Sequence, residues 1–267
     1  MHKLMRTPSI HSIVILILAF AVIPIAEAQN FSERYDRLHA EAEAGDPDAI
    51  YELAVAYYLG HRTAHGGPEQ DRERAVAMFR PLADDGDARA QWRLGHAYEM
   101  GSGVERDAAS AYRWYSAAVE QDFVHAYHPL GQMYMSGRGT QQDEAEGYRL
   151  LRLGAEGNAQ RAMVSLAQIY ESETRGPEYD PALAVHWYRQ AAEQNNSVAV
   201  RRLSDAYLNG HGVERDPVQA VRVYVEFEER SGREQTRALM RILGELSEEE
   251  REAVIAVGDK EDWLSDR

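Results

Sequence analysis

An aspartate recurs through the middle of the chain every 36 or 37 residues, and this interval restricts the possible folds more than any other feature. Asp71, Asp107, Asp143, Asp180 and Asp216 are separated by 36, 36, 37 and 36 residues. Alanine or glycine follows each aspartate four residues later, and a pair of apolar or aromatic residues begins three residues after that. This spacing predicts an amphipathic helix that each aspartate caps at its N-terminus. A period of this length is typical of stacked helical repeats.

A second predicted helix precedes each aspartate-capped helix. It carries Ala, Leu and Tyr at positions i, i+4 and i+8, which lie on one stripe of a helix. Eight residues before each leucine stands a residue type that tolerates the left-handed backbone conformation at the end of a preceding helix. These five residues are Gly45, Gly86, Asp122, Asn158 and Asn195. The five triplets are Ala49-Leu53-Tyr57, Ala90-Leu94-Tyr98, Ala126-Leu130-Tyr134, Ala162-Leu166-Tyr170 and Ala199-Leu203-Tyr207.

Two nearly identical heptapeptides, GSGVERD at 101–107 and GHGVERD at 210–216, stand between the two helices of their units. A Gly-x-Gly turn could cradle a phosphate, but the dinucleotide-binding fingerprint requires a strand before its glycines. Here a helix precedes them. We therefore interpret the glycines as the turn between the two helices and the aspartate as a helix cap.

The stretch AQWRLGHAYEMGSGVERDAASAYRWYSAAVEQD at 90–122 resembles the Sel-one-like repeat (SLR) family, a branch of the tetratricopeptide superfamily. The fifth unit matches it through Ala199, Leu203, Tyr207, Gly210, Gly212, Val213, Asp216, Ala220 and Tyr224. The resemblance implies an all-α fold, a right-handed α-solenoid of about five helix-turn-helix repeats over 46–231, and a role as a binding scaffold. Pro129 departs from the pattern, because it falls inside a predicted helix and should kink it.

The chain begins with the three-part pattern of a secretory signal peptide, which we assign to residues 1–28. Lys3 and Arg6 precede an apolar run over 13–25, and Ala26-Glu27-Ala28 has the form of a cleavage site. The mature protein is then expected in the periplasm, without stable membrane insertion. An uncleaved anchor and secretion beyond the cell are the alternatives.

Helical caps are predicted at both ends of the repeats, since a solenoid needs polar terminal elements to cover its core. We assign an N-terminal capping helix to 29–45, and capping helices with a tail to 232–267. Ser247 and Glu250 have the spacing of a capping box that opens a helix.

Composition argues against several classes of ligand. The net charge is −15, which disfavours nucleic-acid binding. The chain has no cysteine, so disulfides and thiolate metal sites are excluded. His61 with His65 and His125 with His128 have spacings that suit a metal, but neither pair has further ligands beside it. We expect no metal and no cofactor.

Residues two or five positions from each leucine lie opposite the Ala-Leu-Tyr stripe. In the superfamily that it resembles, this face lines the concave groove. The residues predicted to contact a protein or peptide partner are Tyr51, Val55, Tyr58, Trp92, His96, Glu99, His128, Gln132, Met135, Arg161 and Gln168. Some of them could instead pack against the next unit, and the sequence leaves both interpretations open.

The predicted function is therefore binding, without catalysis. Similar exported repeat proteins imply a periplasmic adaptor or a regulator of signalling or exopolysaccharide assembly, acting on a protein of the bacterial envelope. The alternative is a hydrolase of cell-wall or β-lactam substrates. Against it, Ser102 and Ser136 lack the Gly-x-Ser-x-Gly elbow, and the two lysines, Lys3 and Lys260, form no Ser-x-x-Lys motif.

Overall fold

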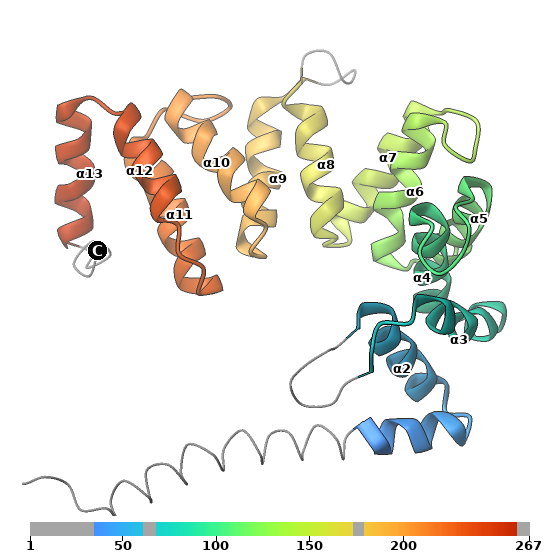
Figure 1. Cartoon of the computed structure of the whole chain (residues 1–267). Helices are drawn as coiled ribbons and strands as arrows, with labels where there is room; N and C mark the ends of the chain where they lie inside the picture. The colour runs from blue at the N-terminus through green and yellow to red at the C-terminus, as the bar shows by residue number, and fades with distance from the viewer. Residues whose placement is uncertain (1–34, 61–67, 173–178, 261–267) are drawn as a thin grey trace, which may run out of the picture. The chain divides into compact units, whose positions relative to one another are not determined.

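The computed structural model describes residues 35–60, 68–172 and 179–260, and every regular element within these ranges is an α-helix (Figure 1). This confirms the predicted all-α fold. A helix over 35–43 precedes the others. The helices that follow it are α2 (Pro47–Leu59), α3 (Arg72–Asp84), α4 (Ala88–Met100), α5 (Ala108–Val119), α6 (Val124–Ser136), α7 (Glu144–Glu156), α8 (Gln160–Tyr170), α9 (Pro181–Glu193), α10 (Ser197–Asn209), α11 (Pro217–Ser231), α12 (Thr236–Glu245) and α13 (Glu248–Lys260).

The chain divides into two compact units, residues 1–121 and 122–267. In the first unit α2, α3, α4 and α5 each pack against the next helix in sequence. In the second unit the helices from α6 to α11 pack consecutively in the same way, and α11 contacts both α12 and α13. Packing between sequence neighbours is the arrangement found in helical repeat proteins.

All five aspartates of the 36-residue period cap helices, as predicted. Asp71 Oδ1 accepts a hydrogen bond from the backbone N–H of Arg74 at 2.9 Å. Asp216 Oδ1 accepts from the N–H groups of Val218 and Gln219, both at 3.0 Å. The carboxylates of the other three aspartates accept from first-turn N–H groups in the same manner. These bonds satisfy donors that a helix start otherwise leaves without a partner.

The junctions between units have the left-handed backbone that the sequence predicts. Their φ angles are 89° at Gly45, 97° at Gly86, 56° at Asp122, 70° at Asn158 and 63° at Asn195. Glycine, asparagine and aspartate adopt this conformation with less strain than other residues. The chain therefore reverses at these five positions and begins the next helix pair.

In both heptapeptides the second glycine of the Gly-x-Gly turn makes a close contact with the preceding repeat. A Cβ on Gly103 would lie 2.2 Å from the carbonyl oxygen of Arg72, at the start of α3. A Cβ on Gly212 would lie 2.1 Å from the carbonyl oxygen of Pro181, at the start of α9. The glycines thus permit both the turn and the approach of one repeat to the next, in agreement with the structural interpretation of the heptapeptides.

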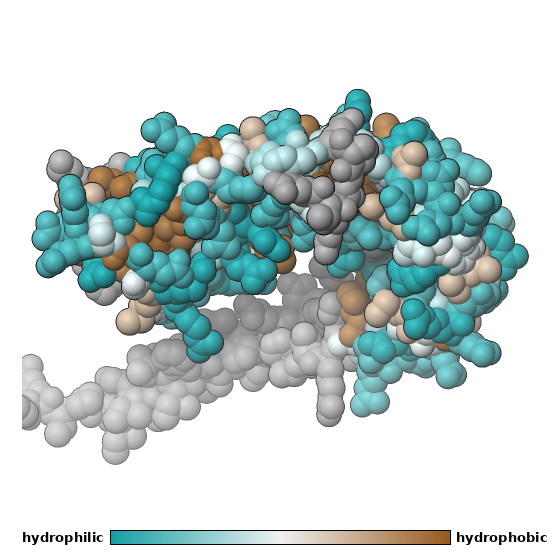
Figure 2. All heavy atoms as spheres, turned by 90° about the horizontal axis from the view of Figure 1, so that it is seen from above, coloured by the Kyte–Doolittle hydropathy of each residue, from teal (hydrophilic) through white to brown (hydrophobic). Residues whose placement is uncertain are grey.

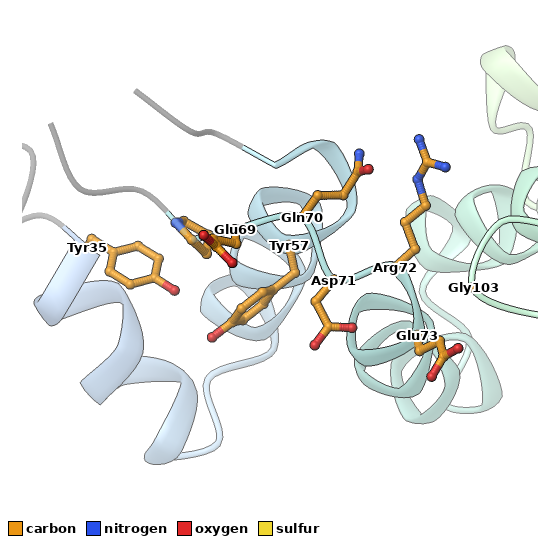
Figure 3. Close-up of a pocket in the computed structure, with 9 residues that line it drawn as sticks. Tyr35, Tyr57, Glu69, Gln70, Asp71, Arg72, Glu73 and Gly103 are labelled. Carbon is orange, nitrogen blue, oxygen red and sulfur yellow. The ribbon is translucent and has the colours of Figure 1, made fainter. Parts of the chain in front are cut away.

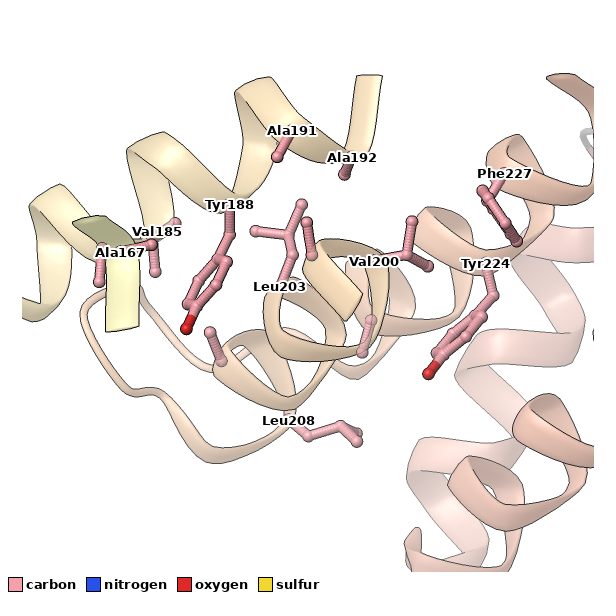
Figure 4. Packing of buried hydrophobic residues seen from close by; sticks show 14 of the residues in the cluster. Ala167, Val185, Tyr188, Ala191, Ala192, Val200, Leu203, Leu208, Tyr224 and Phe227 are labelled. Atoms are coloured by element: carbon pink, nitrogen blue, oxygen red, sulfur yellow. The ribbon is translucent and has the colours of Figure 1, made fainter. Parts of the chain in front are cut away.

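The predicted apolar stripes form the core of each unit. Leu94 and Phe79 are fully buried in the first unit. In the second unit Tyr188, Leu203 and Tyr224 pack between α9, α10 and α11 (Figure 4). Two repeats carry a Trp-Tyr pair on their second helix, and the two members of each pair differ in burial. Tyr115 and Tyr188 are buried, whereas Trp114 and Trp187 are half-buried and pack against the cores.

Pro129 does not interrupt its helix. Helix α6 runs through it from Val124 to Ser136. The proline removes one backbone hydrogen bond, but the helical assignment continues on both sides. Helix α6 therefore keeps the 13-residue length of most first helices in the repeats, and the predicted kink at Pro129 stays a prediction.

Of the predicted terminal segments, the signal peptide at 1–28 lies outside the described residues. At the other end the predicted capping box is confirmed. Ser247 N–H donates to Glu250 Oε2 at 2.9 Å, and Glu250 N–H donates to Ser247 Oγ at 3.2 Å. Within the residues that the structure describes, no helix has the length and apolar character needed to span a membrane.

Candidate functional site

The predicted partner-binding residues of the first unit lie on α2 and α4. Their aromatic members form a connected series of rings that begins in the core. Phe79, which is fully buried, contacts Tyr51 and Tyr58 at ring-centroid distances of 5.6 and 6.3 Å. Tyr58 in turn meets His96 at 6.1 Å, and His96 meets Trp92 at 6.4 Å. We call these five residues the aromatic series.

The members of the aromatic series differ in exposure. Tyr58 is only 6% exposed, because its ring packs on Phe79 and its hydroxyl shares a 3.0 Å hydrogen bond with His96 Nδ1. Tyr51, Trp92 and His96 are half-buried. A partner can therefore touch these three rings, whereas Tyr58 acts mainly as the support beneath them.

Two arginines hold the exposed rings in place. The guanidinium of Arg89 lies 4.5 Å from the ring centre of Tyr51, and that of Arg93 lies 4.7 Å from the ring centre of Trp92. Arg93 Nε also donates to the Tyr51 hydroxyl at 3.4 Å. These cation–π contacts fix two aromatic side chains and reduce the conformational entropy that they would lose on binding a partner.

Arg89 is neutralised by two carboxylates. Its Nη2 donates to Asp87 at 2.6 Å and to Asp48 at 2.7 Å. Hydrogen bonds to Asp87 and Asp48 raise the pKa of Arg89 above its usual value. Burial alone would raise the pKa of Asp87, but the hydrogen bonds from Arg89 and Ala90 outweigh it, so this pKa lies below its usual value.

The remaining predicted residues of the first unit are half-buried. Val55 packs against the core. Glu99 accepts a 2.9 Å hydrogen bond from the hydroxyl of the buried Tyr115, so its carboxylate is used within the fold. Leu59 and Met100, the last residues of α2 and α4, are 49% and 61% exposed and add apolar surface at the ends of the two helices.

In the second unit the predicted residues on α6 and α8 make polar contacts between repeats. His128 Nε2 shares a 3.0 Å hydrogen bond with Ser165 Oγ, to which Gln132 Nε2 also donates at 3.3 Å. Gln168 is half-buried. Arg161 is exposed, and Met135 lies where a Cβ on Gly147 would clash with it. Here the structure favours packing between repeats for His128 and Gln132, and packing within one helix pair, against α7, for Met135.

Sequence reasoning missed the residues that precede the core leucines by one position. Arg93 contacts Tyr51 of the preceding repeat, Ser165 contacts His128, and Arg202 lies 3.7 Å from Glu171. In each case a residue of the later repeat contacts the helix face of the earlier repeat on which partner-binding residues are predicted. A comparison of this position across the repeats would have singled out these polar residues, none of which suits a core.

A second feature of the first unit is a cavity of about 660 Å³ between the helix over 35–43, α2 and the start of α3 (Figure 3). Tyr35 and Tyr57 line one part of it, and Glu69, Asp71 and Glu73 line another. Its surface is polar and acidic, and it contains none of the predicted site residues. Asp71 is committed to capping α3.

The two histidine pairs were considered as metal ligands in the sequence. His61 and His65 lie outside the described residues. His125 is exposed, and His128 is bonded to Ser165. Across 35–60, 68–172 and 179–260, the structure shows no group of three His, Cys, Asp or Glu residues placed to hold a metal ion.

The space-filling view shows a mostly hydrophilic surface, with apolar residues gathered mainly at its left, over the C-terminal helices, and single ones elsewhere (Figure 2). The large apolar residues that are most exposed within the described part of the chain include Leu59 and Met100 on the first unit and Met240 on the second.

Paired helices, left-handed junctions and contacts between consecutive repeats define this chain as an α-helical repeat protein. The sequence family described as Sel1 repeat matches residues 47–87, 88–123, 124–158, 160–196 and 197–222. The chain belongs to the Sel1 repeat family. This confirms the resemblance and the predicted solenoid class with five helix-turn-helix repeats. Sel1 repeat proteins generally mediate protein–protein interactions, and these scaffolds are generally non-enzymatic.

Similar curated proteins are much longer than this chain. An uncharacterised protein of Neisseria meningitidis is 27% identical over 71% of this chain and 30% of its own length. The ERAD-associated E3 ubiquitin-protein ligase component HRD3A of Arabidopsis thaliana is 30% identical over 34% of this chain and 13% of its own. The chitin synthase regulator SKT5 of Saccharomyces cerevisiae is 35% identical over 28% of this chain and 10% of its own.

Two solved structures are similar over most of this chain. A Sel1 repeat protein from Oxalobacter formigenes is 26% identical with a TM-score of 0.62 and covers 84% of both chains. A protective antigen present in uropathogenic Escherichia coli strains, with an SLR fold, is 32% identical with a TM-score of 0.61. It matches 74% of this chain and 41% of its own.

Proposed function

We propose that this chain is an exported scaffold that binds a protein of the bacterial envelope through Tyr51, Trp92 and His96, the members of the aromatic series on α2 and α4 that a partner can touch, as a periplasmic adaptor or regulator. The signal-peptide pattern at 1–28 and the absence of cysteine support export without disulfides. Two curated relatives are named as a component of a ligase and as a regulator of a synthase, which supports an adaptor role.

The observation that carries the proposal is the connection of half-buried rings to the buried core. Tyr51, Trp92 and His96 are half-buried, and each is linked through ring contacts to Phe79 or Tyr58 beneath. Arg89 stacks on Tyr51 and Arg93 stacks on Trp92. Binding hot spots are enriched in Trp, Tyr and Arg, and rings that are already fixed lose little entropy on association.

The test compares partner capture by two variants of the mature chain. Trp92→Asp removes the ring at the end of the aromatic series, whereas Met240→Asp makes the same kind of change at a residue that is 69% exposed on the other unit. Each protein, with matched helicity and melting temperature, is used to capture proteins from an envelope extract, followed by quantitative mass spectrometry. We expect a protein captured by the wild type and by Met240→Asp to be lost with Trp92→Asp.

Equal capture by all three proteins would contradict the proposed site.

Cell fractionation tests the proposed compartment separately, because recovery of the chain in the cytoplasmic fraction would contradict export. The alternative of a hydrolase is tested with purified protein on muropeptides and a chromogenic β-lactam, on which we expect no turnover.

A further inference from the structure

In two of the repeats, a glutamate at the end of the first helix accepts a hydrogen bond from a buried tyrosine of the second helix. Tyr115 donates to Glu99 at 2.9 Å, and Tyr188 donates to Glu171 at 2.8 Å. Each tyrosine stands eight residues after its capping aspartate, and each glutamate stands five residues after its core leucine. The carboxylate therefore satisfies a hydroxyl at the edge of the core.

The last repeat has the tyrosine without the glutamate. Tyr224 occupies the position of Tyr115 and Tyr188, but Leu208 stands where the two glutamates do. No carboxylate of the described residues accepts a hydrogen bond from Tyr224. The hydroxyls of Tyr188 and Tyr224 point to the same side of the helices, where Leu208 also lies (Figure 4). Tyr224 is 5% exposed, against 0% and 1% for the other two tyrosines, so part of its surface is left uncovered.

The Tyr224 hydroxyl is a hydrogen-bond donor beside two positive charges. Burial raises the pKa of this hydroxyl, and the charges of Arg241 and Arg201 oppose the rise without reversing it. The hydroxyl therefore keeps its proton at neutral pH. Since Arg241 donates a hydrogen bond to the hydroxyl oxygen, the proton of the hydroxyl is directed elsewhere.

Arg241 is paired within the chain, whereas Arg201 is not. Arg241 Nη2 lies 3.0 Å from Asp205, and its Nη1 lies 3.6 Å from Glu245. Arg201 stands four residues before Asp205 on α10 and is exposed. It makes no hydrogen bond or ion pair with the residues that the structure describes. Because Asp205 pairs with α12, the guanidinium of Arg201 stays available to a ligand.

Arg237 on α12 adds a further positive charge. It follows Arg201 by 36 residues, which is also the separation of Asp205 and Arg241, two residues in contact. The spacing therefore predicts that Arg237 lies beside Arg201. Arg237 is exposed and has no ion pair within the described ranges. Three guanidinium groups thus meet two carboxylates, those of Asp205 and Glu245, in a chain whose net charge is −15.

The preceding repeat contains the complete arrangement. Glu171 Oε2 accepts from Tyr188, and Glu171 Oε1 lies 3.7 Å from Arg202 of the following repeat. One carboxylate thus joins a tyrosine of the second helix to an arginine of the next unit. At Tyr224 the tyrosine and the arginines are present, and the chain supplies no carboxylate between them. Hydrogen bonds to a carboxylate from a hydroxyl and a guanidinium are of the strong, charge-assisted kind.

We propose that the surface at Arg201, Tyr224 and Arg237, on α10, α11 and α12, binds an acidic segment of a partner protein. One glutamate side chain of the segment accepts the hydrogen bond of Tyr224 and pairs with Arg201, as the internal glutamates do in other repeats. A neighbouring carboxylate of the segment meets Arg237. Met240 stands about 100° around α12 from Arg241 and lies outside this surface. The surface belongs to the second unit and does not depend on the aromatic series.

The experiment is a titration of the isotope-labelled mature chain with a synthetic peptide that carries four consecutive glutamates, followed by NMR chemical shifts. The comparison peptide carries four glutamines in their place. We expect the glutamate peptide to shift resonances of α10–α12 and to bind at least about tenfold more tightly, since charge-assisted pairing is lost in the amide. Equal affinity for the two peptides, or shifts outside α10–α12, would overturn the proposal.

Two variants distinguish this site from a general attraction between charges. Arg201→Gln removes a charge, whereas Tyr224→Phe removes only the hydroxyl and leaves every charge in place. Both are expected to weaken binding of the glutamate peptide at least about fivefold. Phe79 occupies the equivalent position in the first repeat and is fully buried, so phenylalanine suits this part of the core. Unchanged binding by Tyr224→Phe would overturn the proposal.

Arg233→Gln is the matched control. Arg233 is exposed between α11 and α12, and its side chain makes no ion pair with the described residues. The substitution removes the same charge from the same unit, and we expect it to leave the affinity unchanged. A loss as large as that of Arg201→Gln would show that net charge alone governs binding, and would also overturn the proposal.

Discussion

At the scale of single residues, Gly212 shows how one missing side chain sets the distance between two repeats. Its φ is 73°, and a Cβ there would lie 2.1 Å from the carbonyl oxygen of Pro181. Gly232 has a similar φ of 64°, but a Cβ there would meet nothing within 4 Å. Both positions therefore require a positive φ, but only Gly212 also requires the close approach of a neighbouring repeat.

We predict that Gly212→Ala destabilises the protein more than Gly232→Ala does. Both substitutions carry the left-handed strain, about 1–2 kcal/mol for a residue with a Cβ. Only Gly212→Ala adds a clash with backbone, which side-chain rotation cannot relieve. Urea denaturation monitored by circular dichroism measures the difference, and equal losses of stability would show that the contact with Pro181 is unimportant.

The residues that cap helices or adopt the left-handed backbone conformation could be predicted from the sequence. The burial and orientation of the aromatic side chains could not. An aspartate cap or a left-handed asparagine depends on local chemistry that recurs in every repeat, so Asp107 and Asn158 were assigned correctly. Tyr58 was placed on the binding face by its helical position, yet it is buried because Phe79 and His96 enclose its ring. That outcome depends on side chains from two other helices.

At the scale of elements, α13 is held by the ion pair between Arg215 and Glu250 together with the Ser247 capping box. The hydrogen bond from Arg215, followed by that from the Ser247 N–H, lowers the pKa of Glu250 to about 2. Because this pKa is depressed in the folded state, the stabilisation is complete above the usual carboxyl pKa. It is lost as the pH falls from about 4.5 towards about 2.

We therefore expect the start of α13 to fray as the pH falls through this window. Backbone chemical shifts of residues 248–252, the first turn of α13, report helix content there and provide the measurement. In Arg215→Gln the loss should begin at a higher pH, because the main cause of the lowered pKa has been removed. Identical pH profiles in the two proteins would exclude the ion pair as the cause.

At the scale of the whole molecule, the described part of the chain has two core clusters, one in each compact unit. The five-repeat organisation could be predicted because the same spacing recurs throughout. The division between residues 121 and 122 could not, because the repeat pattern continues across it without change. Because each unit has its own core, a substitution that destabilises one core should reduce the stability mainly of that unit, as nearest-neighbour coupling in repeat proteins predicts.

Leu94→Ala and Leu203→Ala test this locality. Both leucines are at most 3% exposed and occupy equivalent positions, so each change should cost about 2–5 kcal/mol. Hydrogen exchange should accelerate mainly in α2–α5 for Leu94→Ala and mainly in α8–α11 for Leu203→Ala. Acceleration spread equally over both units would mean that the chain unfolds as a single cooperative body.

We propose that the face of α2 and α4 that bears Tyr51, Trp92 and His96 contacts a protein of the envelope. The most direct measurement places a photo-reactive benzophenone amino acid at position 92 in living cells, and at position 240 as the control. We predict a discrete cross-linked protein in the envelope fraction from position 92 and none from position 240. The same adduct from both positions, or none from position 92, would contradict the account.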